Sequence, residues 1–140
     1  MSTDSTALFV SVKPRFAEKI LAGEKSVELR RVRPSVTPGT LVIFYASSPT
    51  REVVGTGRIK AIDTDSPTAL WERHRSNVGL PRSEYRTYFE GVRQAVGIVL
   101  TEVERLPQSV PLADLRERLA GFEPPQSFRY VDAAQAATLI

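Results

Sequence analysis

The sequence predicts an α+β fold in which a small mixed or antiparallel β-sheet curls toward a barrel and short helices flank it. First, five or so segments have the apolar or alternating pattern of strands, and short helical segments lie between some of them. Second, the run from Ser26 to Asp63 joins its strands by loops, so it lacks the strict strand and helix alternation of a parallel α/β sheet. Third, 140 residues suit one domain with a single core, which we place at residues 7–140.

The first elements are a strand and a helix. Residues 1–6 are small and polar, which predicts a flexible N-terminus. Residues 8–12 are apolar and form the first predicted strand. Pro14 interrupts it and suits the first turn of a helix, which we expect to run to about Ala22.

The next strand, predicted over residues 26–31, organises the candidate site. Gly23 can take the left-handed conformation that ends the preceding helix, and Lys25 follows at the turn. Polar and apolar residues then alternate, so Glu28 and Arg30 lie on the same face. If that face lines a cavity, the pair and Lys25 form a charged pocket; if it faces water, they form an ordinary solvated strand face.

Two strands form the predicted centre of the sheet. Residues 33–39 contain prolines and a glycine and predict a loop. Residues 41–46 are apolar and aromatic enough for a central strand, and residues 53–63 supply the next one. Gly55 and Gly57 leave one face of that strand without side chains. This spacing indicates a bulge, a barrel corner, or the close approach of another backbone or a ligand.

The second half of the chain is predicted to combine short helices with one long strand. Its expected elements, in order, are a helix from Pro67 to about His74 capped by Ser66, a helix near residues 81–89, a strand over 95–103, a helix over 111–119, an extended proline-containing segment over 122–130, and a final helix to Ile140 capped by Asp132. No internal repeat is visible.

Positive charge is concentrated near the N-terminus. The net charge of the chain is +3, yet one segment carries seven cations against three acids. These cations are Lys13, Arg15, Lys19, Lys25, Arg30, Arg31 and Arg33. Such a concentration is typical either of a surface that attracts polyanions or of an ordinary solvated basic surface.

Several classes of protein are excluded by composition. The chain has no cysteine and one histidine, so disulfides, thiolate nucleophiles and a zinc site of the usual ligands are not expected. It contains no long apolar run, P-loop, dinucleotide fingerprint or nucleophile elbow. We therefore predict a cytoplasmic protein without a membrane span, a secretion signal, a metal or a cofactor.

The stretch from Gly23 to Arg30 resembles the marker of the ASCH domain, a PUA-like β-barrel with a Gly-x-Lys-x-x-Glu-x-Arg run. All four marker residues are present, as Gly23, Lys25, Glu28 and Arg30. The likeness continues through Tyr45-Ala-Ser-Ser-Pro49, Val54-Gly-x-Gly, Leu70-Trp71, Tyr88-Phe-Glu-Gly91 and Pro124-Pro-Gln-Ser-Phe-Arg-Tyr130. These segments are similar to the subgroup predicted to act in transcription or RNA metabolism.

The resemblance implies a barrel with a cleft beside the helix that precedes the marker strand. PUA-like relatives use this cleft to bind RNA or a modified base. One ASCH branch deacetylates N4-acetylcytidine with a lysine, a threonine and a glutamate, and other members are reported as ribonucleases. Lys25 falls on the lysine of that branch, but Glu28 occupies the place of its threonine, so this activity is not carried over.

The candidate ligand-binding residues combine cations, a carboxylate, hydroxyls, an amide and a ring. They are Lys13, Lys25, Glu28, Arg30, Arg31, Arg33, Tyr45, Ser47, Gln126 and Arg129. Tyr45 and Ser47 share a strand face and suit stacking and hydrogen bonding of a base, although Tyr45 also suits a core position. If the protein is an enzyme, Lys25 and Glu28 take acid–base roles, assisted by Ser127 or Tyr45.

Other residues of the candidate site have structural alternatives. Gln126 and Ser127 either complete the cleft or belong to a strap that packs Phe128 into the core. Glu28 either acts on a ligand or orients its cationic neighbours. The helical aromatic residues Trp71, Tyr85, Tyr88 and Phe89 are predicted to be core.

Three functions are compatible with these features. The leading hypothesis is a module that binds RNA, another single-stranded nucleic acid or a nucleotide-like small molecule, with cations holding phosphates and the cleft receiving a base. The second is a metal-independent hydrolase acting on RNA or a modified nucleoside. The third is a regulatory domain that senses a small molecule. Oligomeric state is left open.

Overall fold

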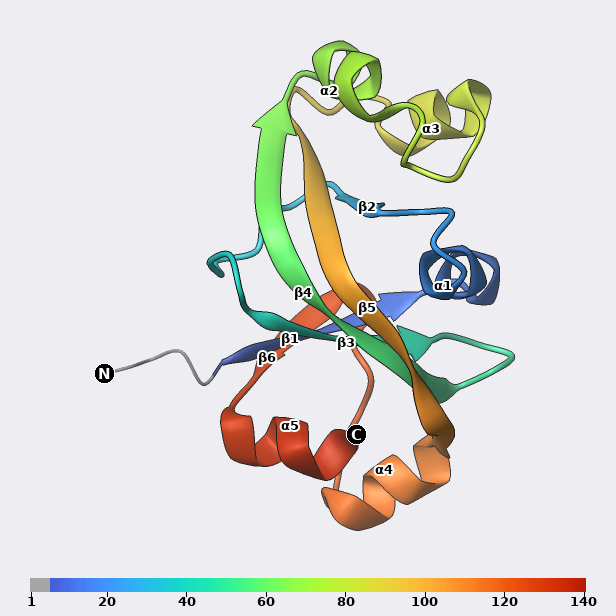
Figure 1. Cartoon of the computed structure of the whole chain (residues 1–140), viewed down its shortest axis with the longest axis vertical. Coiled ribbons are helices and arrows are strands. Elements are labelled where there is room, and N and C mark those ends of the chain that lie inside the picture. Colours follow the sequence, from blue (N-terminus) through green and yellow to red (C-terminus); the bar gives the residue numbers. More distant parts are fainter. Residues whose placement is uncertain (1–5) are drawn as a thin grey trace.

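The structure is a computed structural model that describes residues 6–140 (Figure 1). Of the N-terminal segment predicted to be flexible, residues 1–5 lie outside the described residues. In chain order the elements are β1 (Ala7–Val12), α1 (Pro14–Leu21), β2 (Val27–Arg30), β3 (Leu41–Ala46), β4 (Glu52–Asp65), α2 (Pro67–His74), α3 (Arg82–Tyr88), β5 (Ala95–Pro111), α4 (Leu112–Arg118), β6 (Phe128–Val131) and α5 (Ala133–Leu139).

The sheet is mixed and has six strands in the order β2-β5-β4-β3-β1-β6. β1 and β3 pair in parallel, and the other neighbours pair in antiparallel fashion. The predicted α+β fold with a curled, barrel-like mixed sheet is thereby confirmed. The sixth strand, β6, arises from the C-terminal part of the segment predicted only as extended.

β4 and β5 form the longest strand pair of the sheet and run through most of the length of the molecule (Figure 1). The two strands have 14 and 17 residues, and shifts in their register mark bulges along the pair. In Figure 1, α2 and α3 lie at one end of this pair and α4 and α5 at the other. The strand predicted over residues 95–103 therefore continues to Pro111, because its second half pairs with the start of β4.

Three clusters of buried side chains fill the spaces between the sheet and the helices. One contains Leu115 of α4 and Leu139 of α5. A second includes Ile20 of α1, and a third includes Leu70 of α2 and Tyr85 of α3. Each helix thus buries an apolar side against the sheet, and burial of such side chains is the main favourable contribution to folding.

A side chain bridges the open side of the sheet. The strand order leaves β2 and β6 as its two edges. Arg30, at the end of β2, donates from Nη2 to the backbone oxygen of Ser11 in β1 at 2.9 Å. Its Nη1 donates to Oγ of Ser127, next to β6, at 3.4 Å. The guanidinium of Arg30 therefore connects the two sides of the curled sheet.

Gly55 should not tolerate a side chain. A Cβ atom there would lie 2.5 Å from Cδ2 of Leu21 and 2.7 Å from the backbone oxygen of Glu104. Of the reasons that the sequence left open for this glycine, two are observed: the register of β4 against β5 shifts between Val53 and Gly55, as at a bulge, and the backbone of Glu104 approaches closely. We expect Gly55→Ala to lower the free energy of unfolding by about 1–3 kcal/mol, the loss usual for overpacking. Urea titrations of the variant and the wild type would measure this loss.

Gly57→Ala is the matched control for this prediction. A Cβ at Gly57 would meet only side chains, Phe44 and Val103, at 3.2 Å. Both side chains can shift, so the loss of stability should be smaller than at Gly55. Equal losses in the two variants would contradict the explanation based on the rigid backbone of Glu104.

Candidate functional site

A cavity of about 910 Å³ opens beside α1 and β2. Residues from both halves of the chain line it, namely Ser11, Val12, Lys13, Phe16, Lys25, Glu28, Leu29, Arg30, Tyr45, Ser47, Ser48, Arg51, Leu80, Glu84, Thr87, Tyr88, Leu112, Arg116, Glu123, Pro124, Pro125 and Gln126. The lining contains five cations and three acids, so the cavity carries an excess of two positive charges.

A buried network of three charges forms part of this lining. Oε2 of Glu28 accepts a hydrogen bond from Nη2 of Arg30 at 2.6 Å, and Oε1 lies 3.5 Å from Nζ of Lys25. The three residues are only 2% (Lys25), 6% (Glu28) and 8% (Arg30) exposed. Of the two arrangements predicted for this strand face, the one lining a cavity is therefore observed.

Lys25 is held by its neighbours in a largely apolar setting. Its Nζ donates to the backbone oxygen of Val78 at 2.6 Å and lies 5.0 Å above the centre of the Phe16 ring. The stem packs against Gly79, where a Cβ would come within 2.9 Å of Cβ of Lys25. Burial lowers the pKa of Lys25 below 10.5 because it penalises the ammonium form, and Glu28 opposes this shift.

The lowered pKa of Lys25 predicts how stability changes with pH. Between the lowered pKa in the folded state and 10.5, the unfolded state binds more protons at Lys25 than the folded state does. Stability contributed by Lys25 should therefore rise with pH across this window, by about 1.4 kcal/mol for each pKa unit of lowering.

Urea titrations at several alkaline pH values would test this expectation. The free energy of unfolding of the wild type, minus that of Lys25→Met, should increase as the pH approaches 10.5. Other lysines and tyrosines titrate in both proteins, so the difference isolates Lys25. A difference that falls with pH would mean that the ammonium of Lys25 is favoured by folding.

Two tyrosines give the cavity aromatic walls. Tyr45 is 3% exposed and belongs to a core cluster, as its core alternative predicted, and its side chain also lines the cavity. Burial raises the pKa of Tyr45, while the neighbouring cation Arg51 acts in the opposite direction. The phenol of Tyr45 is therefore protonated at neutral pH.

Tyr88 departs from the predicted core position. Its side chain lines the cavity and is 36% exposed, and its hydroxyl donates to the backbone oxygen of Leu29 at 3.2 Å. Its neighbours Tyr85 and Phe89 are buried as predicted, and Trp71 is half-buried. The aromatic residues of α3 and of the position after it thus fill the core on one side of the helix and line the cavity on the other.

The C-terminal segment before β6 covers one side of the cavity. Oγ of Ser11 donates to the backbone oxygen of Pro125 at 2.6 Å, which fixes this segment to β1. Gln126 lines the cavity, whereas Ser127 reaches it only through its hydrogen bond with Arg30. Phe128 is half-buried against a core cluster, so the segment both packs into the core and completes the cavity.

The remaining predicted ligand-binding residues divide into two groups. Lys13 and Ser47 line the cavity. Arg31, Arg33 and Arg129 do not: Arg31 is exposed, Arg33 donates to Oγ1 of Thr64 at 2.8 Å, and Arg129 lies 5.0 Å above the centre of the Phe122 ring.

Several charged residues of the lining were not predicted from the sequence. Arg51 follows β3, in the short connection between the strands predicted over residues 41–46 and 53–63, and its place beside the end of a candidate strand was a usable signal. Glu84, Arg116 and Glu123 come from α3, α4 and the following loop. Arg116 donates to Glu123 at 2.8 Å, and nothing local to α4 indicates that Arg116 lines the cavity.

Comparison with known proteins decides the family. The family model described as "Domain of unknown function (DUF365)" matches residues 6–116. A protein of Zymomonas mobilis named "ASCH domain-containing ribonuclease" is 31% identical over 137 residues, which cover 98% of this chain and 92% of that protein. The chain belongs to the ASCH-domain family.

The fold of this ASCH domain agrees with solved structures. A crystal structure of ASCH from Zymomonas mobilis superposes with a TM-score of 0.90 at 31% identity, covering 95% of this chain and 92% of that one. That protein was also crystallised as a tyrosine-to-phenylalanine mutant and as a serine-to-alanine mutant, each with a TM-score of 0.90. A protein of Rhodopseudomonas palustris, 16% identical with a TM-score of 0.60, shares the fold.

The resemblance predicted from the marker residues is thus confirmed. In this ASCH domain Gly23 has a φ of 81° and follows the end of α1, while Lys25, Glu28 and Arg30 face the cavity. Among residues 6–140 no helix is long and apolar enough to cross a membrane. Over the same residues, no three histidine, aspartate or glutamate side chains are grouped closely enough to hold a metal ion.

Proposed function

We propose that this ASCH domain binds single-stranded RNA in the cavity. The observation that carries the proposal is a cavity with an excess of positive charge and two tyrosine rings in its lining. Lys13 and Arg51 can neutralise phosphates, and Tyr45 and Tyr88 offer rings beside which an unpaired base can lie. The name of the Zymomonas relative, a ribonuclease, supports RNA as the ligand.

The size of the cavity supports a short unpaired segment as its occupant. Its volume of about 910 Å³ lies within the range of about 300–1,000 Å³ that is usual for pockets holding small ligands. A nucleotide fits such a space, whereas a paired duplex presents its bases inward. Unpaired bases can instead stack on aromatic side chains and expose their edges for hydrogen bonds.

Salt dependence of binding tests the proposal. The probe is a fluorescent oligoribonucleotide with 2′-O-methyl groups, which prevent attack by the 2′-oxygen, and anisotropy gives the affinity at several salt concentrations. Each phosphate contact on a single strand contributes about 0.7 to the slope of log affinity against log salt. Lys13→Ala combined with Arg51→Ala should reduce that slope by about 1.4 if each residue contacts one phosphate.

Arg31→Ala combined with Arg33→Ala is the matched control. It removes the same charge from exposed positions outside the cavity lining, so the slope should stay near the wild-type value. If the control pair lowers the slope and the cavity pair does not, RNA follows the outer basic surface and the proposed site is wrong. If the wild type does not bind the probe, the proposed function itself fails.

Cleavage of the bound RNA is a second candidate function, favoured by the name of the same relative. We propose attack by a 2′-hydroxyl oxygen on the adjacent phosphorus. The bond from phosphorus to the 5′-oxygen breaks, which gives a 2′,3′-cyclic phosphate and a free 5′-hydroxyl. The proton of the 2′-hydroxyl passes to a base, and the 5′-oxygen receives a proton from an acid.

The charged network and Tyr45 can take these roles. Glu28 offers its carboxylate as the base, and Arg30 orients it through the 2.6 Å hydrogen bond. The phenol of Tyr45, protonated at neutral pH, serves as the acid. The ammonium of Lys25 stabilises the charge that develops on the phosphate oxygens, and Ser127 positions the guanidinium of Arg30.

Substrate chemistry and a chelator test the cleavage proposal. An oligoribonucleotide should be cut, whereas the same oligonucleotide with a 2′-deoxy sugar at the cleavage position should remain intact at that position. Turnover should survive an excess of EDTA, because cationic side chains supply the charge stabilisation. Cleavage of the 2′-deoxy substrate, or loss of turnover in EDTA, would contradict this mechanism.

A further inference from the structure

A second, smaller hollow lies between α2 and α3, and the proposed function makes no use of it. Its volume is about 290 Å³. Its lining includes Trp71 from α2 and Arg82, Tyr85, Arg86 and Phe89 from α3 or the residue that follows it. We call it the α2–α3 hollow.

Helix α3 is a wall shared by this hollow and the larger cavity. Glu84, Thr87 and Tyr88 line the cavity, whereas Arg82 and Arg86 line the α2–α3 hollow. Residues three or four apart share one face of a helix, so the two sets point to different sides of α3. Because a helix with its side chains is about 10–12 Å across, a single strand that leaves the cavity reaches the hollow by passing over α3.

The two arginines of the α2–α3 hollow are suited to a phosphate. Arg82 and Arg86 are one helical turn apart and exposed. Within residues 6–140 neither makes an ion pair or a side-chain hydrogen bond, whereas Arg15, Arg105 and Arg116 all pair with acids. An anion bridging the two guanidinium groups would supply the partners that the chain does not, and Arg binds phosphate in a bidentate manner.

The aromatic side of the hollow is suited to a base. The ring centres of Trp71 and Tyr85 are 4.8 Å apart, and those of Tyr85 and Phe89 are 4.9 Å apart. The hydroxyl of Tyr85 donates to the backbone oxygen of Pro67 at 2.6 Å, which fixes the cluster against α2. Trp71 is half-buried and lines the hollow, so part of its ring can receive a stacked base.

We infer that the α2–α3 hollow is a second subsite for the RNA strand held in the cavity, with a phosphate on Arg82 and Arg86 and a base on Trp71. The inference rests on the proposed function, because it extends the same strand by further nucleotides. Sites for single-stranded nucleic acid commonly span about 4–16 nucleotides, more than one cavity of this size holds.

The chain offers a direct readout, because Trp71 is its single tryptophan. A 2′-O-methyl octanucleotide should quench the fluorescence of Trp71 as it binds, while a dinucleotide, which fills only the cavity, should leave it unchanged. Anisotropy of the labelled octanucleotide measures binding anywhere on the protein. Binding by anisotropy without any change at Trp71 would overturn the inference and leave the proposed function intact; no binding at all would overturn both.

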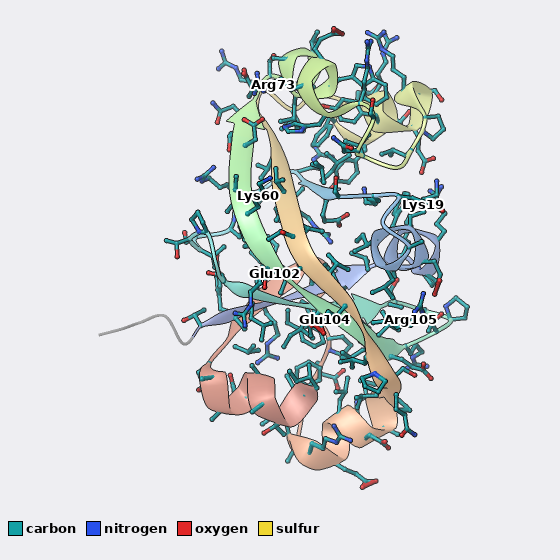
Figure 2. All side chains as sticks on the ribbon, viewed as in Figure 1. Lys19, Lys60, Arg73, Glu102, Glu104 and Arg105 are labelled. Carbon is teal, nitrogen blue, oxygen red and sulfur yellow. The ribbon has the colours of Figure 1, made fainter. Side chains whose placement is uncertain are left out.

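Three variants test which groups of the hollow contribute. Trp71→Ala should weaken octanucleotide binding about 5- to 150-fold, the loss expected for one base-stacking contact, and leave dinucleotide binding unchanged. Arg82→Ala combined with Arg86→Ala should weaken binding of the octanucleotide but not of the dinucleotide. Lys60→Ala is the control cation: Figure 2 shows Lys60 partway along β4, and it lines neither hollow. Lys60→Ala should leave the binding of both probes unchanged. Equal weakening of octanucleotide and dinucleotide binding by Trp71→Ala, or by the double arginine variant, would overturn the inference.

Discussion

Glu28→Gln should lower the free energy of unfolding by about 3–5 kcal/mol, the loss usual when one partner of a buried ion pair is removed. Glu28 is the only acid of the network that it forms with Lys25 and Arg30. Glutamine keeps the shape of the side chain but not its charge. The ammonium and guanidinium groups would then remain buried without a counter-charge, and an uncompensated buried charge is strongly destabilising.

The position of Arg30 in the fold adds to the expected loss of stability. Arg30 bridges the open side of the sheet, and one of its nitrogens, Nε, already has no hydrogen-bond partner within the described residues. Loss of the carboxylate would leave the guanidinium with only the oxygens of Ser11 and Ser127 as acceptors. Glu28 is therefore a structural residue as well as a candidate base.

Urea titrations measure the free energy of unfolding of Glu28→Gln, and Glu18→Gln serves as the matched control. Glu18 of α1 also accepts from an arginine, Arg105, at 3.1 Å and 3.2 Å, but both side chains of this pair are more than half exposed. Arg105 is labelled on β5 in Figure 2. Exposed pairs contribute little because water and salt screen them. A loss at Glu28 as small as at Glu18 would show that the buried cations find other compensation.

Local features were predictable because local rules govern them. Gly23 takes the left-handed conformation that ends α1, and Oγ of Ser66 accepts from the backbone nitrogen of Ala69 at 3.2 Å as a helix cap. Asp132 and Gln135 form a reciprocal capping box at the start of α5. In each case the residue type and its neighbours within one helical turn determine the conformation.

The composition of the cavity could not be predicted in the same way. Alternation along β2 placed Glu28 and Arg30 on one face, but it could not say what lies opposite that face. The opposing groups Arg51, Glu84 and Arg116 arrive through sheet curvature and helix packing, which depend on the whole fold. Charge density along the chain was also a poor guide, since Arg33 lies in the same basic segment and outside the cavity.

Catalysis and stability overlap at the charged network, so a catalytic test needs a residue outside it. Loss of turnover in Glu28→Gln would follow from unfolding as readily as from loss of a base. Tyr45 lies on β3 and lines the cavity, and it is not part of the hydrogen bonds among Lys25, Glu28 and Arg30. Phenylalanine keeps its ring packing against Phe9, whose ring centre is 5.7 Å away.

Tyr45→Phe should therefore reduce cleavage of an oligoribonucleotide by about 100-fold or more, the contribution usual for a general acid, while its urea midpoint stays close to that of the wild type. Affinity for the 2′-O-methyl probe should also persist, because the ring remains. Tyr130→Phe is the matched control: Tyr130 is 46% exposed and its hydroxyl accepts from the backbone nitrogen of Ser35, away from the cavity. Tyr45→Phe removes one oxygen and leaves the charged network in place. Undiminished turnover would therefore mean that another group donates the proton to the 5′-oxygen. The ammonium of Lys25, in the same lining, would be the candidate donor.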